Sequence, residues 1–277
     1  MNNRKLLKTV QYVILVTGVV LILLPMFLVV ITAFKSNLQI ADNWFSLPIP
    51  LYLDNFKELL AKPDLKYAFM NSIVIAGAFL IISTLLLPVT AYGVSRTMAG
   101  NRFMRYFYYF LIIGLFVPFQ AKMIPLIMIA SKLGMMNVAG IIILYIAGST
   151  CEGVFLCAGY LQSIPPDMEE ASYIDGAGFF RTYWQVILPL MKPILATVAI
   201  QNALWVWNDF QLPLLVLNKS SKFWTLILYV YNFKTAYQTD FGLIFASFLI
   251  SMLPIMVFYV CMQKQIIGGL TSGAVKG

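Results

Sequence analysis

The chain has 277 residues, of which 61% are hydrophobic and 11% are charged. Soluble domains carry about 25% charged residues, so this composition excludes an ordinary soluble protein and indicates several membrane spans. The formal net charge is +8, for which anionic lipid and the inner-leaflet potential account. We therefore expect membrane lipid, and no nucleic acid, as a partner.

A helix needs roughly 20 apolar residues to cross the hydrocarbon core of a bilayer. It crosses as a helix because each backbone polar group must be paired inside its own segment. Six runs reach that length: three contain no charged residue, and each of the others contains one. The runs are 9–34, 67–95, 106–131, 133–161, 194–217 and 241–263. The sequence predicts an all-α, polytopic membrane protein in which six transmembrane helices form a single domain over residues 1–277.

The first run is expected to be a retained anchor, since it is longer than the roughly 7–15 apolar residues of a signal peptide. With the N-terminus inside, all five arginines fall on the inner side, namely Arg4, Arg96, Arg102, Arg105 and Arg181. This bias favours both termini in the cytoplasm, although the total number of cations is similar on the two sides. In the outer segment 35–66, four lysines are balanced by four acidic residues.

Three prolines and a glutamate stand inside the predicted spans. Pro88, Pro118 and Pro125 are expected to kink the second and third spans, because proline removes a backbone donor. Glu152 lies well inside the fourth span, where a carboxyl group needs a partner or water. We expect a structural pairing in preference to a proton relay, and Lys122 is the nearest cation by depth.

Catalytic and cofactor motifs are absent from the sequence. It has three cysteines without CxxC spacing, no histidine, and no GxxxxGK[ST] loop for ATP phosphates. We expect no catalytic residue, no metal site and no cofactor on this chain, and no enzymatic activity. If ATP drives the protein, the nucleotide belongs to another subunit.

A polar, charged segment, residues 164–192, separates the fourth and fifth spans. Pro166 can stop one helix and begin the next, and the acidic residues that follow it suit the helix dipole. Gly176 offers a turn before a second helix over Phe179–Leu188. We predict a cytoplasmic helix-turn-helix that docks into a partner's groove, the alternative being an amphipathic interfacial hairpin without a partner.

This segment resembles the signature loop of permease subunits of bacterial binding-protein-dependent ATP-binding-cassette (ABC) importers. That loop reads E-A-A, a Gly four residues later and then I-x-L-P; the matching residues are Glu170, Ala171, Ser172, Gly176, Val186, Leu188 and Pro189. Ser172 and Val186 are mild departures. Ile174–Ala177, Trp207–Phe210 and Gly269–Gly277 are similar to the second permease of the carbohydrate (maltose and multiple-sugar) branch. The likeness covers nearly the whole chain from residue 69 onward.

The resemblance implies a bacterial cytoplasmic membrane and several partners: a homologous permease, two ATPase subunits that hold ATP and Mg²⁺, and an extracellular or periplasmic sugar-binding protein. The residues implied for a coupling helix that contacts the ATPase are Glu169, Glu170, Ala171, Ser172, Asp175, Gly176, Ala177, Leu188 and Pro189. The tail 264–277, flexible by its glycines, would reach the interface of the two ATPases, unless it is a frayed end. The loop Asn218–Asp240 would face the sugar-binding protein, unless its aromatic residues form an interfacial belt.

Polar residues on the fifth span make a case for a transport pathway. Gln201 and Asn208 are seven apart, as are Asn202 and Asp209, so each pair would share one side of a helix that faces protein or water. Trp205 and Trp207 add flat apolar surface on which sugar rings can stack. The pathway candidates are Gln201, Asn202, Trp205, Asn208 and Asp209. Hydrogen bonding between helices is the alternative role.

By this resemblance, the chain forms half of a transmembrane pathway for carbohydrate, with oligosaccharide favoured by family association. ATP hydrolysis on partner subunits would drive the uptake. An ion-coupled secondary transporter that uses Glu152 and Asp209 is the alternative, although such carriers usually show an internal repeat. A membrane enzyme is disfavoured, since no carboxylate pair or nucleophile motif has suitable spacing.

Overall fold

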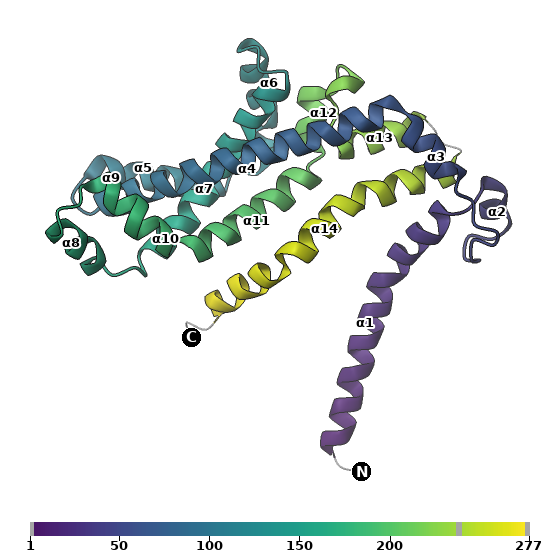
Figure 1. Ribbon diagram of the computed structural model, residues 1–277, viewed down its shortest axis with the longest axis horizontal. Coiled ribbons are helices and arrows are strands. Elements are labelled where there is room, and N and C mark those ends of the chain that lie inside the picture. The colour runs from purple at the N-terminus through teal and green to yellow at the C-terminus, as the bar shows by residue number, and fades with distance from the viewer. Residues whose placement is uncertain (1–2, 237–239, 275–277) are drawn as a thin grey trace. The chain divides into compact units, whose positions relative to one another are not determined.

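The computed structural model describes residues 3–236 and 240–274, with side chains at 7–234, 236 and 240–263. These ranges are helical apart from short connections, which confirms the all-α prediction (Figure 1). The helices are α1 (Asn3–Ala33), α2 (Asn37–Asp42), α3 (Asp54–Ala61), α4 (Pro63–Thr97), α5 (Arg102–Leu115), α6 (Phe119–Lys132), α7 (Val138–Leu161), α8 (Asp167–Ile174), α9 (Phe179–Thr182), a π-helical turn (Tyr183–Ile187), α10 (Leu188–Leu190), α11 (Lys192–Asn208), α12 (Gln211–Leu217), a 3₁₀ turn (Ser221–Phe223), α13 (Leu226–Ala236) and α14 (Phe241–Ala274). Backbone contacts divide the chain into unit 1, residues 1–66 and 228–254, and unit 2, residues 67–227 and 255–277.

Four helical segments are long and apolar enough to cross a membrane: Leu7–Ala33, Pro63–Thr97, Val138–Leu161 and Phe241–Gln263. Two further pairs pass the same test but are bent sharply. α5 and α6 meet at 110°, and the stretch Phe179–Leu190 meets α11 at 73°. The described residues thus hold four spans, or up to six if each bent pair crosses once, and the count of six stays a prediction.

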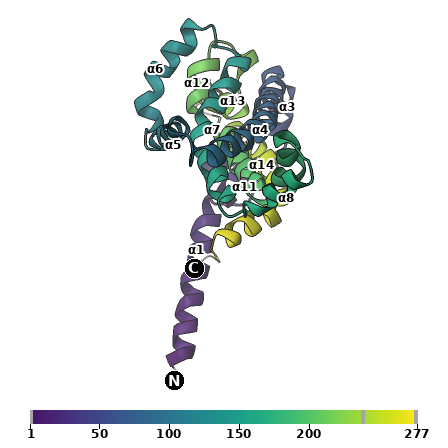
Figure 2. The same cartoon turned by 90° about the vertical axis from the view of Figure 1, so that its left-hand side faces the viewer.

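The third predicted span is broken between α5 and α6, as Figure 2 shows. α5 ends at Leu115, and α6 begins directly after Pro118. Proline has no N–H to continue the helical bonding, so the kink expected at Pro118 is a complete break. Pro88 and Pro125 lie inside helices.

The prediction of one helix over 194–217 is wrong. α11 ends at Asn208, Asp209 adopts an extended backbone (φ −71°, ψ 130°), and α12 begins at Gln211. One carboxylate oxygen of Asp209, Oδ1, accepts a hydrogen bond from the Gln211 N–H at 3.0 Å. Aspartate competes for backbone donors in this way, which favours helix starts over helix interiors.

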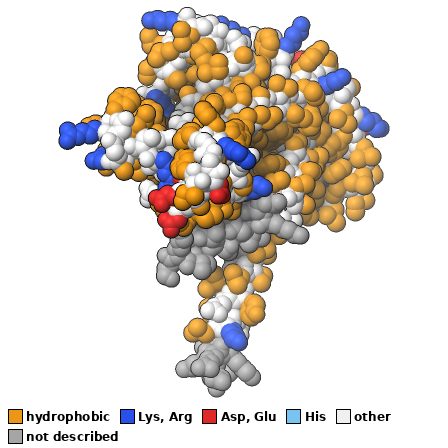
Figure 3. Space-filling model, turned by 60° about the vertical axis from the view of Figure 1, so that its left-hand side comes forward, with side chains coloured by type: hydrophobic (Ala, Val, Ile, Leu, Met, Phe, Trp, Pro, Cys, Tyr) orange, Lys and Arg blue, Asp and Glu red, His pale blue; other side chains and the backbone are white. Residues whose placement is uncertain are grey.

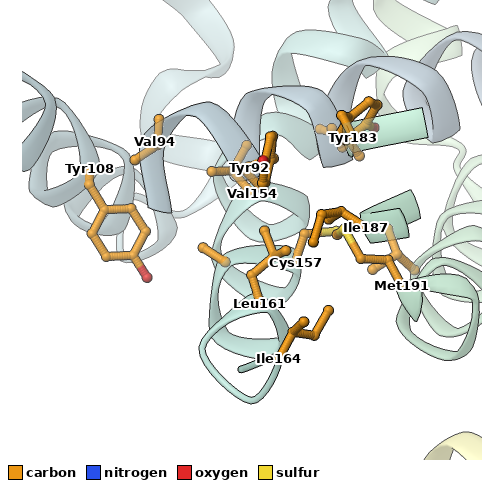
Figure 4. Close-up of a cluster of buried hydrophobic side chains, with 14 of the residues drawn as sticks. Tyr92, Val94, Tyr108, Val154, Cys157, Leu161, Ile164, Tyr183, Ile187 and Met191 are labelled. Carbon is orange, nitrogen blue, oxygen red and sulfur yellow. The ribbon is translucent and has the colours of Figure 1, made fainter. Parts of the chain in front are cut away.

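Unit 2 packs around α7, which contacts α5, α11 and α12. Its buried core combines side chains of α4, α5, α7 and the stretch after α9 (Figure 4). Tight packing, and not expulsion of water, drives helix association in lipid, so small residues let helices approach. Gly153 on α7 shows this: an added Cβ would lie 2.5 Å from the Leu87 Cδ1 of α4. Within unit 2, α8 and α9 lie at one end, away from α6 and α12 (Figure 1).

Buried polar contacts hold the end of α1 in unit 1. The Asn55 Nδ2 donates to the carbonyls of Ala33 (3.0 Å) and Lys35 (2.8 Å). Lys35 is fully buried, and its Nζ donates to the carbonyls of Asn43 and Trp44, each at 3.0 Å. Burial lowers the pKa of Lys35. This lysine therefore takes backbone carbonyl oxygens as its partners.

The last helix runs farther than predicted. The sixth span was expected to end at Gln263 before a flexible tail, whereas α14 continues as a helix through Ala274. The described residues do not include 275–277 or the side chains beyond Gln263. They also do not include residues 237–239 of the loop Asn218–Asp240, which was predicted to face the sugar-binding protein.

Candidate functional site

The polar segment between α7 and α11 forms a helix, a turn and a second helical stretch. α8 follows Pro166 and ends at Ile174, with three acidic residues in its first turn. Gly176 then reverses the chain with φ +81°, a left-handed conformation that glycine adopts without strain. Across this turn, the hydroxyls of Ser172 and Thr182 share a hydrogen bond of 3.0 Å.

The second stretch, predicted as a helix over Phe179–Leu188, is helical without a gap through Leu190 but irregular in its middle. It consists of α9, the π-helical turn and the short α10. Pro189 accounts for the irregularity, because its nitrogen has no hydrogen to donate to the Gln185 carbonyl. We call the combined segment 167–190 the hairpin.

Glu169 anchors the hairpin to α4. Its side chain is buried, and Oε2 accepts a hydrogen bond from the Tyr92 hydroxyl at 2.8 Å. Oε1 accepts one from the Arg96 Nε at 2.6 Å, a contact that is also an ion pair. The Tyr92 ring stacks on Phe179 of α9, with 5.1 Å between centroids. Neither Tyr92 nor Arg96 was predicted from the sequence as a site residue. Arg96 could have been singled out, because it is a positively charged residue at the end of an apolar run.

The outward side of the hairpin, which we call the hairpin face, is exposed. Ile174 and Phe180 keep 87% and 76% of their surface accessible, and Glu170 is exposed too. A shallow hollow of about 340 Å³ between α8 and the second stretch is lined by Met168, Ala171, Ser172, Asp175, Ala177, Arg181, Gln185 and Val186. Figure 3 shows acidic, basic and hydrophobic side chains together on the side of the molecule that carries α8.

The implied coupling residues do not form one surface. Ala171, Ser172, Asp175 and Ala177 line the hollow, whereas Glu169 points inward. Leu188 packs against the core of unit 2, in α10.

A second candidate site is a cavity of about 270 Å³ where three helical segments of unit 2 meet. Phe119, Lys122 and Leu126 come from α6; Leu144, Ala147 and Gly148 come from α7; and Trp205, Asp209, Gln211 and Leu212 flank the break between α11 and α12. The break at Asp209 therefore places a carboxylate and an indole ring on one wall.

Tyr145 of α7 positions both of these groups. Its hydroxyl donates to the Asp209 Oδ2 at 2.9 Å. Its ring meets Trp205 edge-on, with centroids 5.3 Å apart and planes at 83°. Phe79 contacts Trp205 in the same way at 6.1 Å. Gly148 also lies close against the Trp205 ring: a Cβ added to this glycine would lie only 3.2 Å from the Trp205 Cη2.

Two of the five pathway candidates, Trp205 and Asp209, line this cavity. The predicted alignment of Asn202 with Asp209 on one helix side is wrong, because α11 ends before Asp209. The Asn208 Nδ2 donates to the Leu204 carbonyl of its own helix at 2.8 Å. Asn202 is buried, and its Nδ2 has no partner within the part of the chain that the structure describes.

Glu152 has an amide as its partner. The Gln201 Nε2 of α11 donates to the Glu152 Oε1 of α7. Lys122, the nearest cation by depth, lines the cavity. The expected structural pairing of Glu152 thus exists, but it joins a carboxyl group to an amide on the neighbouring helix, and the expected cation takes no part in it.

Known proteins resemble this chain along most of its length. A family model described as "Binding-protein-dependent transport system inner membrane component" matches residues 85–270. The multiple sugar-binding transport system permease protein MsmG of Streptococcus mutans is 43% identical, over 96% of each chain. The probable starch degradation products transport system permease protein AmyC of Thermoanaerobacterium thermosulfurigenes is 34% identical, over 96% of this chain and 97% of that protein.

A solved structure shows the same fold. A chain of a bacterial ABC transporter involved in the import of the acidic polysaccharide alginate superposes with a TM-score of 0.83, over 95% of this chain and 98% of that one, at 23% identity. The family match covers more than half of the sequence, and the apolar helices fit a multi-pass bacterial membrane protein. This protein therefore belongs to the family of inner membrane components of binding-protein-dependent transport systems.

Proposed function

We propose that this chain is the permease subunit of an ABC importer and forms half of a transmembrane pathway for carbohydrate, with oligosaccharides as substrates. The relatives named above are permeases of multiple-sugar and starch-product transport systems. The hairpin carries the proposal: it exposes apolar surface on one side and is tied to the long helix α4 on the other. A segment that is to receive force from a docked subunit needs both properties.

The proposed complex contains a homologous permease, two ATPase subunits and an extracellular or periplasmic sugar-binding protein. ATP and Mg²⁺ would be held by the ATPase subunits, and this chain would perform no bond chemistry. Both termini would lie in the cytoplasm, which puts the hairpin and all five arginines on that side. Both relatives named above are permease proteins of transport systems, and they give no support to that alternative.

The proposed mechanism follows from the contacts that tie Glu169 of the hairpin to Arg96 and Tyr92 of α4. ATP binding would draw the ATPase subunits together and move the docked hairpin face. The Arg96–Glu169 ion pair and the Tyr92 hydrogen bond would carry this motion to α4, and the pathway would switch between its inward-facing and outward-facing states. We also propose that the end of α14 approaches the ATPase interface and that the segment 218–240 faces the sugar-binding protein.

Purification in mild detergent from the native membrane, with mass spectrometry of every co-purifying chain, tests this function. We expect a second permease and a P-loop ATPase. Recovery of this chain alone, under conditions that preserve a known membrane complex, would contradict the importer and favour an ion-coupled carrier.

Asp209→Asn should lower sugar uptake several-fold while the ATPase subunit still co-purifies. Asparagine keeps an oxygen for the Gln211 N–H, so α12 retains its start, but the cavity loses its negative charge. Uptake of radiolabelled sugar by cells and affinity purification of the complex check the two halves of this prediction. If the complex dissociates, Asp209 has a structural role in assembly and not a role in the pathway.

A further inference from the structure

The cavity between α6, α7 and the α11–α12 break is lined by two oppositely charged side chains that are not paired with each other. Lys122 and Asp209 both line it. Across residues 7–234 and 240–263, neither of them forms an ion pair. Oppositely charged side chains in one mostly apolar cavity normally pair, because an uncompensated charge away from water is costly. The Lys122 ammonium group can therefore donate to a ligand, and the Asp209 oxygens, which already accept from the Gln211 N–H and the Tyr145 hydroxyl, keep further lone pairs for ligand donors.

The other residues that line the cavity indicate the shape and polarity of that ligand. Trp205 is 41% exposed, and its ring is held by Tyr145, Phe79 and the bare backbone of Gly148. A fixed indole offers a flat apolar surface, and an amide, Gln211, stands at the same wall. The charges of Lys122 and Asp209 sum to zero, which favours an uncharged ligand with many hydroxyl groups.

The volume limits the size of the ligand. Drug-sized molecules occupy sites of roughly 300–1,000 Å³, and this cavity has about 270 Å³. It therefore suits one ring of a saccharide at a time. A neutral pyranose presents one apolar face and a rim of hydroxyls, which match the indole ring and the surrounding polar groups.

We propose that this cavity is a saccharide subsite on this chain, in which Trp205 stacks against one neutral pyranose ring, Asp209 accepts hydrogen bonds from its hydroxyls and Lys122 donates to its oxygens. This inference rests on the proposed function and deepens it, because it makes the chain a direct contact for the sugar. Tyr145 is a positioning residue here, since it holds Asp209 and Trp205 from behind.

The test uses the complete importer in proteoliposomes, supplied with its sugar-binding protein and ATP. Radiolabelled raffinose and maltotriose serve as probes, and the measured quantity is sugar taken up per ATP hydrolysed. Lys122→Met and Trp205→Leu remove the donor and the stacking surface. Lys132→Met is the matched control, because Lys132 lies on the same helix α6 but does not line the cavity.

We expect Lys122→Met and Trp205→Leu each to lower the sugar-to-ATP ratio about tenfold, while ATP hydrolysis stimulated by the sugar-loaded binding protein is retained. Lys132→Met should match the wild type. A wild-type ratio in both cavity variants overturns the subsite. An equal loss of uptake and stimulated hydrolysis also overturns it, since the cavity would then serve the structural switch. If the wild type accumulates neither probe on ATP addition, the proposed function itself is at fault.

Discussion

Replacement of Gly176 by valine is expected to abolish uptake while the protein remains in the membrane. Gly176 has φ +81°, and a β-branched side chain strongly disfavours that conformation. A Cβ added at this position would have no neighbouring atom within 4 Å, so the effect comes from the backbone and not from a clash. Strain of this kind amounts to about 1–3 kcal/mol, enough to displace the turn without unfolding the spans. Uptake, and immunodetection of the protein in membranes, measure the two expectations.

Gly178→Val is the matched control. Gly178 lies two residues farther along the same turn, is also free of atoms within 4 Å of an added Cβ, and has φ −82° and ψ 170°. Valine adopts that extended conformation readily. We therefore expect near-normal uptake from Gly178→Val. Normal uptake in Gly176→Val would contradict the docking role of the hairpin. Loss of uptake in both variants would mean that the added side-chain volume, and not the backbone conformation of the turn, causes the defect.

The hairpin could be predicted from sequence because its signals are local. Pro166, the acidic residues after it and Gly176 specify a helix start and a left-handed turn by their own covalent and electrostatic properties. The apolar runs predicted α4, α7 and α14 for the same reason. Local chemistry does not say which side of α8 faces inward: Glu169 and Glu170 are neighbours about 100° apart around the helix, and only packing against α4 distinguishes them.

The cavity was less accessible to sequence reasoning because long-range contacts create it. The run 194–217 reads as one apolar helix, and at the break Asp209 bonds both to the nearby Gln211 N–H and to Tyr145, 64 residues away. Depth along a span suggested Lys122 as the partner of Glu152, but rotation of the helices decides the contact, and it brings Gln201 there. Trp205 was identified by its chemistry, whereas the supporting Phe79 and Gly148 carry no distinguishing sequence signal.

Replacement of Glu169 by glutamine is expected to lower uptake by more than tenfold while the ATPase subunit still co-purifies. The change leaves Arg96, whose side chain is 22% exposed, without its carboxylate partner. Loss of one member of a buried ion pair costs about 3–5 kcal/mol, and the remaining exposure of Arg96 puts this pair at the lower end. The hairpin would then lose its hold on α4, although its exposed face could still dock. Sugar uptake and ATP hydrolysis, measured on the same purified complex, should become uncoupled: uptake should fall while ATP hydrolysis continues.

Glu170→Gln separates anchoring from docking, because the adjacent carboxylate is exposed on the hairpin and Glu169 is buried. We expect Glu170→Gln to weaken retention of the ATPase subunit, in contrast to Glu169→Gln. The double variant Arg96→Gln with Glu169→Gln tests the pair directly: since it leaves no unpaired buried charge, its loss of uptake should be smaller than the product of the two single losses. Multiplicative losses would show that Arg96 and Glu169 act independently, and the ion pair would then not be the link that carries the motion of the hairpin into α4.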